Sequence, residues 1–572
     1  MELAVYAVPA VAVIVAVAAF APRLGVAAPL VLVLVGVALS FLPGLPLVEV
    51  PHELILDGAL PPILYAAALS LPLADFRRNV LPIASLAVIL VLITAFGTGF
   101  LLFALLPKLA LAPAIALGAV ISPPDAVAAT SIGRRLGLPP RLLTVLEGEG
   151  LVNDATALVL LRSATAAAAG TLLTPVALGR DLVLATVLGI AIGLAAGFVT
   201  MAARTRLDDP VLDTAVSLAV PFVAFVPAQF FGASGVIAVV TAGLYASHRA
   251  PAALSPQARI SDRLNWRTIQ FLLENGVFLL IGLELRSLVH DVHPEVLGFG
   301  PTITVALAAT LALVGIRLIW MVPLVLALRA RAALAERALL RQWLAFDHYR
   351  RGRRGRIATR YWRRAERTYA RRRADLEELR RDDVTARGGV VLGWAGMRGV
   401  VTLAAAQSLP PHTPYYPQLV LIACIVAVLT LLVQGGSLPA VIRRLGIRGT
   451  DAVDDQRELA SLLDELGYAG LIALDDAAAE MDGIDEVDPD VLERVRRTSF
   501  VRAEAAWERS RGPGIPLEET PNRLYRRLRL AVVQAERERL LEARRHGEYT
   551  SHALLQAQAL LDVEESRLQP PR

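Results

Sequence analysis

The chain has 572 residues, 55% of them hydrophobic, and a mean hydropathy of +0.54. A helix needs about 20 apolar residues to cross a bilayer, and roughly the first 445 residues supply many such runs, so a set of separate soluble domains is excluded. The formal net charge of +5 hides an uneven distribution, with arginine concentrated in one stretch and acid in another. A single cysteine, Cys424, excludes disulfides and cysteine-based metal sites within one chain.

We predict an all-α polytopic membrane protein with about thirteen transmembrane helices. The predicted spans are, in chain order, 2–20, 25–42, 53–71, 80–106, 111–133, 141–166, 180–202, 211–229, 233–248, 266–288, 301–328, 389–408 and 417–440. Clusters of proline and glycine separate them. The run from Leu3 to Phe20 lacks a preceding basic segment and a cleavage site, so we expect a first span and not a removable signal.

The loops alternate in charge along the chain. Arginines follow the odd-numbered spans, as Arg204 and Arg206 follow the seventh and Arg259, Arg263 and Arg267 follow the ninth. Little basic charge follows the even-numbered spans. Because positive loops stay on the cytoplasmic side, this pattern predicts an external N-terminus and a cytoplasmic tail.

Composition divides the chain into four segments. Residues 1–328 and 388–445 form the transmembrane core. Between them, 329–387 is a basic cytoplasmic loop, expected either to form a helix near anionic headgroups or to be a solvated insertion. We do not expect nucleic-acid binding there, since positive cytoplasmic loops are ordinary in membrane proteins. The tail, 446–572, is predicted to be a small helical bundle that serves regulation, dimer contact or simple stabilisation.

The fifth span is interrupted by two prolines and an acid. Pro123 and Pro124 each remove an amide donor, and unwound backbone within a membrane is tolerated only where it is buried or lines a cavity. Such a break frees carbonyl oxygens that can coordinate a cation, so Pro124 is a candidate ligand. Asp125 follows directly, as an ion-site carboxylate or as a cap of the second half-helix. Ser122 is a candidate for the pathway.

The sixth span carries two acids that cannot share a partner. Asp154 lies five residues after Glu149, so the two point roughly 140° apart on a helix. An ionised carboxylate in a membrane costs on the order of 2.5–3.5 kcal/mol, so each must face water, an ion or a partner. Asp154, with Asn153 beside it, is our candidate for binding the transported ion, and Glu149 needs a cation from another helix. Glu147 either lines the entrance or is a solvated acid at headgroup level.

Three further charges lie within predicted spans. Arg317 cannot deprotonate and needs a carboxylate, for which Glu149 is the natural choice. Arg398 lies in a glycine-rich span, where it could neutralise helix-end carbonyls at a second break. Glu274 is a further candidate for the pathway, with its direct role in transport left open.

These motifs together resemble the monovalent cation:proton antiporters of the sodium/proton exchanger type, in the bacterial form with a long hydrophilic loop and a cytoplasmic tail. The resemblance covers roughly residues 1–445, and its most specific parts are 122–128, 149–154 and 396–399. It implies a homodimer with inverted repeats and two crossed, partly unwound helices, here the fifth and twelfth spans.

The resemblance also implies roles for individual residues. Asp154 would be the principal ion-binding carboxylate, Asp125 would lie close to it, and Glu149 would pair with Arg317. Two positions depart from the family pattern: Pro124 often is threonine there, and Gly150 commonly is serine.

We therefore expect an antiporter that exchanges Na⁺, or K⁺ or Li⁺, for H⁺ across the cytoplasmic membrane for pH and cation homeostasis. Asp154 and Asp125 would bind the transported cation; no resident cofactor and no enzymatic activity are expected. A K⁺/H⁺ antiporter and a cation channel remain as alternatives, followed by a membrane receptor without transport.

Overall fold

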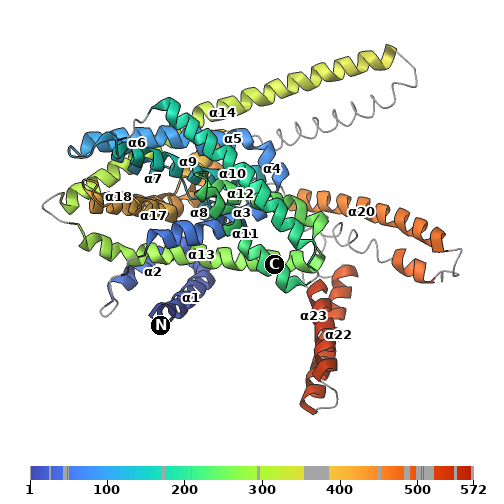
Figure 1. Cartoon of the computed structure of the whole chain (residues 1–572). Coiled ribbons are helices and arrows are strands. Elements are labelled where there is room, and N and C mark those ends of the chain that lie inside the picture. The colour runs from blue at the N-terminus through green and yellow to red at the C-terminus, as the bar shows by residue number, and fades with distance from the viewer. Residues whose placement is uncertain are drawn as a thin grey trace. The chain divides into compact units, whose positions relative to one another are not determined.

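The computed structural model describes residues 2–24, 27–42, 48, 50–170, 174–207, 209–292, 297–352, 386–447, 452–481, 490–496, 504, 507, 521–546 and 551–568. Contacts divide the chain into two units, Met1–Gly449 and Thr450–Arg572. The described residues of both units form helices joined by short loops (Figure 1). The predicted all-α fold is confirmed by this architecture.

The first unit begins with nine α-helices. They are α1 (Glu2–Phe20), α2 (Ala28–Ser40), α3 (Leu60–Ser70), α4 (Leu73–Arg78), α5 (Val80–Ala84), α6 (Val91–Leu105), α7 (Leu111–Ile121), α8 (Ala126–Arg135) and α9 (Pro140–Ala168). A 3-10 turn, η1 (Ala21–Leu24), follows α1, and π-helical turns η2 (Leu54–Ala59) and η3 (Ser85–Leu90) are continuous with the α-helices beside them.

The unit continues with α10 (Pro175–Arg204), α11 (Pro210–Phe230), α12 (Gly235–Ala253), α13 (Pro256–His290), α14 (Phe299–Gly352), α16 (Ala386–Trp394), α17 (Val400–Gln407), α18 (Tyr416–Thr430), η4 (Leu431–Gly435) and α19 (Gly436–Leu445). Prolines occupy the first turns of α9, α10, α11 and α13, where a missing amide donor costs nothing. Proline position thus accounts for several helix starts.

Seven helices among the described residues are long and apolar enough to cross a membrane. They are 80–105, 111–135, 176–204, 210–230, 256–290, 299–331 and 416–445, and shorter apolar helices cover 8–20, 28–40 and 54–70. The predicted sixth span, α9, carries several charged side chains, and the predicted twelfth is divided into α16 and α17. The count of thirteen spans stays a prediction.

One predicted boundary is wrong by about ten residues. The helix α13 begins at Pro256 and not at 266, so Arg259 and Arg263 lie on the same helix as Arg267 and not in a loop before it. The membrane-length part of α14, 299–331, agrees with the predicted eleventh span, and the helix continues to Gly352, so the first part of the basic loop is helical as predicted. Residues 353–385 of that loop lie outside the described residues.

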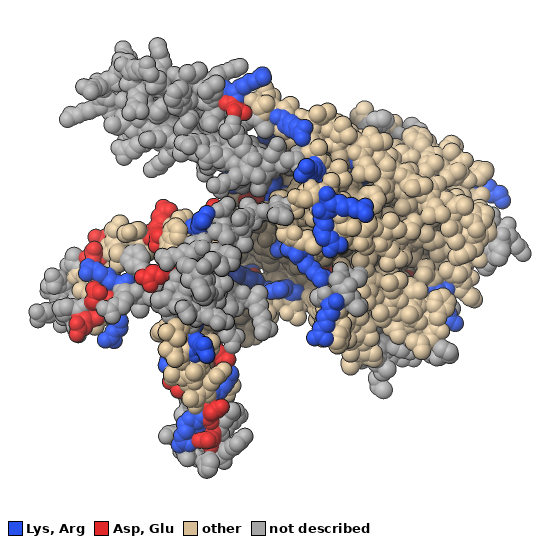
Figure 2. Space-filling model, turned by 180° about the vertical axis from the view of Figure 1, so that it is seen from behind, with Lys and Arg blue, Asp and Glu red and all other residues tan. Residues whose placement is uncertain are grey.

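Much of the surface of the first unit is apolar. Figure 2 shows a broad face with few charged side chains, while blue side chains gather towards one edge. Large apolar side chains are exposed along α10, among them Val183, Val187 and Phe198. Such a surface is expected of helices that contact lipid.

Close glycine contacts join neighbouring helices of the first unit. On α2 and α13, a Cβ atom at Gly36 would collide with the carbonyl oxygen of Leu279, and one at Gly282 would collide with that of Val33. On α7, a Cβ at Gly118 would collide with the carbonyl oxygen of Ala95 on α6. The backbones of these helix pairs therefore contact each other, which small residues at a helix interface permit in membrane proteins.

Two helices of the first unit are broken, and the breaks touch. The first break is the stretch 122–125 between α7 and α8, and the second is 395–399 between α16 and α17. The backbone amide of Asp125 donates to the carbonyl of Met397 over 2.6 Å. The contact agrees with the crossing of the fifth and twelfth spans that the resemblance implied.

The second unit is helical where it is described, with α20 (Ala452–Met481), α22 (Pro521–His546) and α23 (Ser551–Leu568). The helices α22 and α23 pack together and form ion pairs with each other, such as Arg529 with Glu564 and Arg537 with Asp562. Arg496, from the short helical stretch 490–496, pairs with Asp475 of α20. The predicted helical character of the tail is thereby confirmed for these stretches.

Candidate ion-binding site

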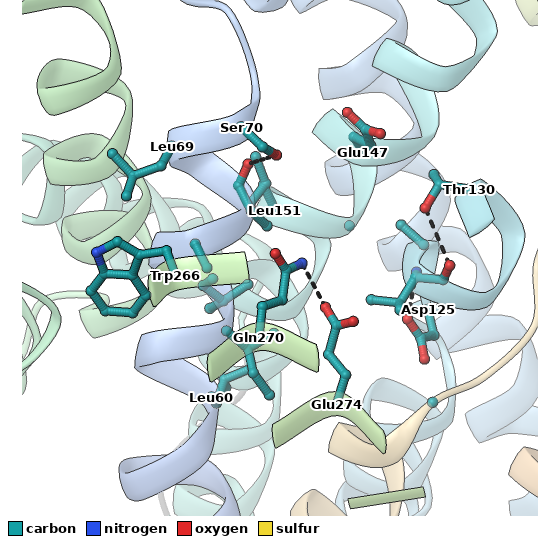
Figure 3. A pocket seen from close by; sticks show the side chains of 18 of the residues that line it. Leu60, Leu69, Ser70, Asp125, Thr130, Glu147, Leu151, Trp266, Gln270 and Glu274 are labelled. Carbon is teal, nitrogen blue, oxygen red and sulfur yellow. Dashed lines mark hydrogen bonds between the residues drawn. The ribbon is translucent and has the colours of Figure 1, made fainter. Parts of the chain in front are cut away.

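A cavity of about 760 Å³ reaches the first break from one side of the first unit. Its walls come from η2, α3, the first break, α8, α9, α12, α13, the end of the second break and the start of α17. Its acidic lining consists of Asp125, Glu147, Asp154, Asp262 and Glu274. Figure 3 shows Asp125 and Glu274 on facing walls of this space, with Glu147 farther along it. Four of the five acids are sequence-predicted site residues; Asp262 is not.

Asp125 is held by the break itself. Its Oδ1 accepts a hydrogen bond from the amide of Val127 over 2.8 Å, which caps the N-terminus of α8. The side chain is half-buried and lines the cavity, so the cap and the cavity acid are one residue. Gly399 of the second break lies against it, since a Cβ there would collide with the Asp125 carboxylate. The two roles expected from the sequence are therefore compatible.

Asp154 on α9 lines the same cavity and is half-buried. Within the described part of the chain, no arginine, lysine or histidine lies within ion-pair distance of its carboxylate. Asn153 beside it is fully buried: its Nδ2 donates to the carbonyl of Pro124 over 2.6 Å, and its Oδ1 accepts from the amide of Asp154. Asn153 thus links α9 to the first break and does not line the cavity, and the Pro124 carbonyl is already engaged.

Glu149 and Arg317 form the ion pair expected from the sequence. Arg317 Nη1 lies 2.5 Å from Glu149 Oε1, and Nη2 lies 2.8 Å from Oε2, a bidentate geometry. Both side chains are buried, and the guanidinium also donates to the carbonyl of Leu392 near the end of α16. The helical angle that separates Glu149 from Asp154 therefore gives them different surroundings, one neutralised by arginine and one facing the cavity.

Arg398 in the second break donates to carbonyls of both breaks. Its Nε donates to Ile121 over 3.0 Å and its Nη2 to Ser122 over 3.3 Å, at the end of α7. Its Nη1 donates to Gly396. The sequence predicted neutralised helix-end carbonyls at the second break; the structure adds those of the first, because the two breaks touch.

Ser122 does not line the cavity, which corrects its expected place in the pathway. Its side chain is buried and bonds the carbonyl of Val91 over 2.9 Å and the hydroxyl of Thr94, both on α6. The backbone turns at the end of α7 and directs this hydroxyl towards α6. Ser122 therefore connects the first break to α6 by hydrogen bonds.

The two remaining pathway candidates do line the cavity. Glu147 pairs with Arg134 of α8 near the mouth. Glu274 accepts from Gln270 Nε2 over 2.7 Å, one helical turn earlier on α13, as Figure 3 shows. Sequence reasoning missed Gln270, although its spacing of four residues from Glu274 was a usable signal.

A buried charge cluster at the cavity wall was also missed. Arg204, expected as a loop arginine, is 2% exposed and bonds Asp213 over 2.7 and 2.8 Å, with Asp262 at 3.3 Å. Asp262 accepts from Ser217, which accepts from the indole of Trp266. The cluster joins α10, α11 and α13. Arg204 was misplaced because the seventh span extends past its apolar run and ends beside the acid of α11.

The arrangement suits the binding of a small cation. Asp125 and Asp154 present carboxylate oxygens, the ligands preferred by hard cations, to a cavity about 760 Å³ in size. A profile for the transmembrane part of sodium/hydrogen exchangers matches residues 10–444. The chain belongs to the sodium/hydrogen exchanger family.

Curated relatives are similar in sequence to this chain over most of its length. A protein named as an uncharacterized Na⁺/H⁺ exchanger from Mycobacterium tuberculosis is 30% identical over 556 residues, 96% of this chain and 93% of the relative. The Na⁺/H⁺ antiporter ApNhaP of Aphanothece halophytica is 28% identical, over 74% of this chain and 70% of its own length. The structure of the sodium proton antiporter MjNhaP1 from Methanocaldococcus jannaschii matches with a TM-score of 0.55, covering 78% of this chain and 99% of that one. At 18% identity this last likeness concerns the fold alone.

Proposed function

We propose that the exchanger moves Na⁺ across the cytoplasmic membrane in exchange for H⁺, with the carboxylates of Asp154 and Asp125 as the binding site. One observation carries the assignment. Asp154 faces the cavity with no cationic partner among the described residues, whereas Glu149, one and a half turns away, is neutralised by Arg317. An acid within a membrane span that has no protein cation beside it is suited to bind a cation from solution.

Exchange follows from competition at this site. A carboxylate oxygen binds either a proton or a cation, so arrival of one releases the other. One such site favours exchange of one Na⁺ for one H⁺. The exchange serves control of internal pH and monovalent cation content. The names of the relatives, Na⁺/H⁺ exchanger and antiporter, support Na⁺ as the substrate.

Access to the site alternates between the two sides of the membrane. The cavity mouth carries Arg134, Arg263 and Arg267, which belong to the segments whose charge predicts a cytoplasmic location. The described state therefore opens to the cytoplasm, with the N-terminus outside and the tail inside. The broken helices and α9 move as a group against a dimer scaffold, as in other transporters with discontinuous helices.

The central test measures exchange after removal of the carboxylate charge. Everted membrane vesicles containing Asp154→Asn are expected to lose the recovery of a pH-sensitive dye on addition of Na⁺. The matched control, Asp181→Asn, removes an acid that pairs with Arg180 on the surface of α10, away from the cavity, and should transport normally. Full transport by Asp154→Asn would overturn the assignment.

Ion preference is tested separately in reconstituted vesicles. Na⁺, K⁺ and Li⁺ are supplied in turn at equal concentration, and internal pH is followed. We expect the largest proton flux with Na⁺. Greater flux with K⁺ would reassign the chain as a K⁺/H⁺ antiporter, and cation flux without proton movement would indicate a channel.

A further inference from the structure

A row of arginines lines the mouth of the cavity on α13. Arg259, Arg263 and Arg267 are spaced by four residues, so they lie on one face of the helix over about 12 Å. All three line the cavity. Arg263 and Arg267 are exposed, and neither has a carboxylate within ion-pair distance in the described part of the chain. Arg259 donates to the carbonyl of Pro251 over 2.7 Å.

The uncompensated charge of this arginine row is unfavourable both for the helix and for cation entry. Like charges four residues apart on a helix repel each other. A positive potential at the mouth of a cation pathway also lowers the local concentration of cations. The neighbouring Arg134 is balanced by Glu147, so the mouth does not lack acids altogether. The described residues therefore supply no counter-ion for the exposed arginines of the row.

Apolar side chains lie beside the row on the same helix. Ile260 is 69% exposed and Leu264 is 64% exposed, and each follows an arginine of the row by one residue. One residue is a rotation of about 100°, so the apolar pair flanks the arginine row. A free phosphate ion would use only the arginines. A phospholipid would use both, with its headgroup on the row and an acyl chain along Ile260 and Leu264.

We propose that the arginine row binds the phosphate of an anionic phospholipid from the cytoplasmic leaflet, with Ile260 and Leu264 contacting its acyl chain. Arginine binds phosphate oxygens in pairs, and basic pockets on the cytoplasmic side of transmembrane helices suit such headgroups. The bound lipid neutralises the mouth. Cation entry to the cavity then depends on the anionic lipid content of the membrane.

Lipid binding is measured on the purified full-length chain by native mass spectrometry with added phosphatidylglycerol or phosphatidylcholine. We expect phosphatidylglycerol to be retained preferentially, and the triple variant R259Q/R263Q/R267Q to bind it on the order of 100-fold more weakly, at roughly tenfold or less per lost charge. The control R77Q/R206Q/R249Q removes three exposed arginines that do not line the cavity and should retain the lipid. Equal retention by both triple variants would overturn the proposal.

Two further variants distinguish a specific loss of lipid binding from misfolding, and a lipid ligand from free phosphate. R259K/R263K/R267K keeps the charge but not the paired geometry, so it should bind phosphatidylglycerol more tightly than the glutamine variant and more weakly than the native chain. Equal loss in the lysine and glutamine variants would show that the positive charge of the row does not hold the lipid and would overturn the proposal. I260S/L264S should weaken lipid retention. If it does not, and inorganic phosphate displaces the bound lipid, the row is a site for free phosphate.

The same proteins separate this proposal from the transport assignment. Mass spectrometry reports lipid binding whether or not Na⁺ is exchanged. In vesicles of phosphatidylcholine with increasing phosphatidylglycerol, the native chain should show a falling apparent KM for Na⁺ and the glutamine variant should not. A chain that retains lipid but exchanges no Na⁺ would count against the proposed function alone.

Discussion

The two helix breaks are built alike in backbone and oppositely in charge. The first break places Asp125 at the cavity, while the second places Arg398, 1% exposed, inside the protein. Arg398 donates to the carbonyls that the first break frees at the end of α7. One break therefore stabilises the other, and a carboxylate is left to face the cavity. Arg398 thus satisfies freed carbonyls of both breaks, while the Asp125 carboxylate caps α8 through the Val127 amide and still lines the cavity.

The largest effect on the difference between the two breaks is expected at Arg398. In Arg398→Met, the carbonyls of Ile121, Ser122 and Gly396 lose a charged donor, and we expect the free energy of unfolding to fall by about 3 kcal/mol or more. Thermal unfolding in detergent measures this. The control Arg286→Met removes one bond to Ser40 and should cost about 1 kcal/mol. Equal shifts in both variants would remove the special role of Arg398.

The contact between the breaks is tested by Gly399→Ala. The added Cβ collides with the Asp125 carboxylate, so we expect a stability loss of about 1–3 kcal/mol and a fall in transport of about tenfold or more. Gly315→Ala on α14 is the control, because its Cβ would have no atom within 4 Å. Normal Na⁺-dependent proton flux in Gly399→Ala vesicles would show that the breaks do not need this approach.

The attachment of the first break to α9 is tested by Asn153→Ala. Loss of the bonds to Pro124 and Asp154 should cost about 1–2 kcal/mol and raise the apparent KM for Na⁺. Asn275→Ala removes a buried asparagine that bonds only its own helix, at Phe271, and serves as the control. If KM is unchanged in Asn153→Ala while stability falls, Asn153 supports the fold and not the site.

The smallest effect is expected at Thr430, whose hydroxyl accepts from the backbone amide of Arg398 over 3.0 Å. Thr430→Val should cost about 1 kcal/mol and leave Na⁺ transport within about twofold, because the side chain touches the second break and not the cavity. Thr310→Val, which loses only a bond to its own helix, is the matched control. A large transport loss in Thr430→Val alone would mean that both breaks shape the ion site.

Sequence reasoning predicted those parts of the site that depend on spacing along one helix. The angle between Glu149 and Asp154 separated a paired acid from a cavity acid, and the demand of a buried guanidinium for a carboxylate identified Arg317. The prolines predicted the first break. The ion-binding roles of Asp154 and Asp125 stay predictions until transport is measured.

What sequence could not predict depends on contacts between distant segments. Ser122 was assigned to the pathway, but the turn of the chain directs its hydroxyl to α6. Arg204 was counted as a loop charge, but a partner on α11 allows it to be buried. The early start of α13 was missed because its first turns are polar, and hydropathy marks only the lipid-facing part of a helix. That missed segment carries Arg259 and Arg263, two of the three residues of the arginine row.

The glycine contacts between α2 and α13 limit how the cavity can open. At Gly36 and Gly282 the two backbones lie so close that a Cβ atom would collide with the facing helix. We therefore expect a displacement of α13, which forms a wall of the cavity, to carry α2 with it. Distance probes on α2 would report the opening of a cavity that α2 itself does not line.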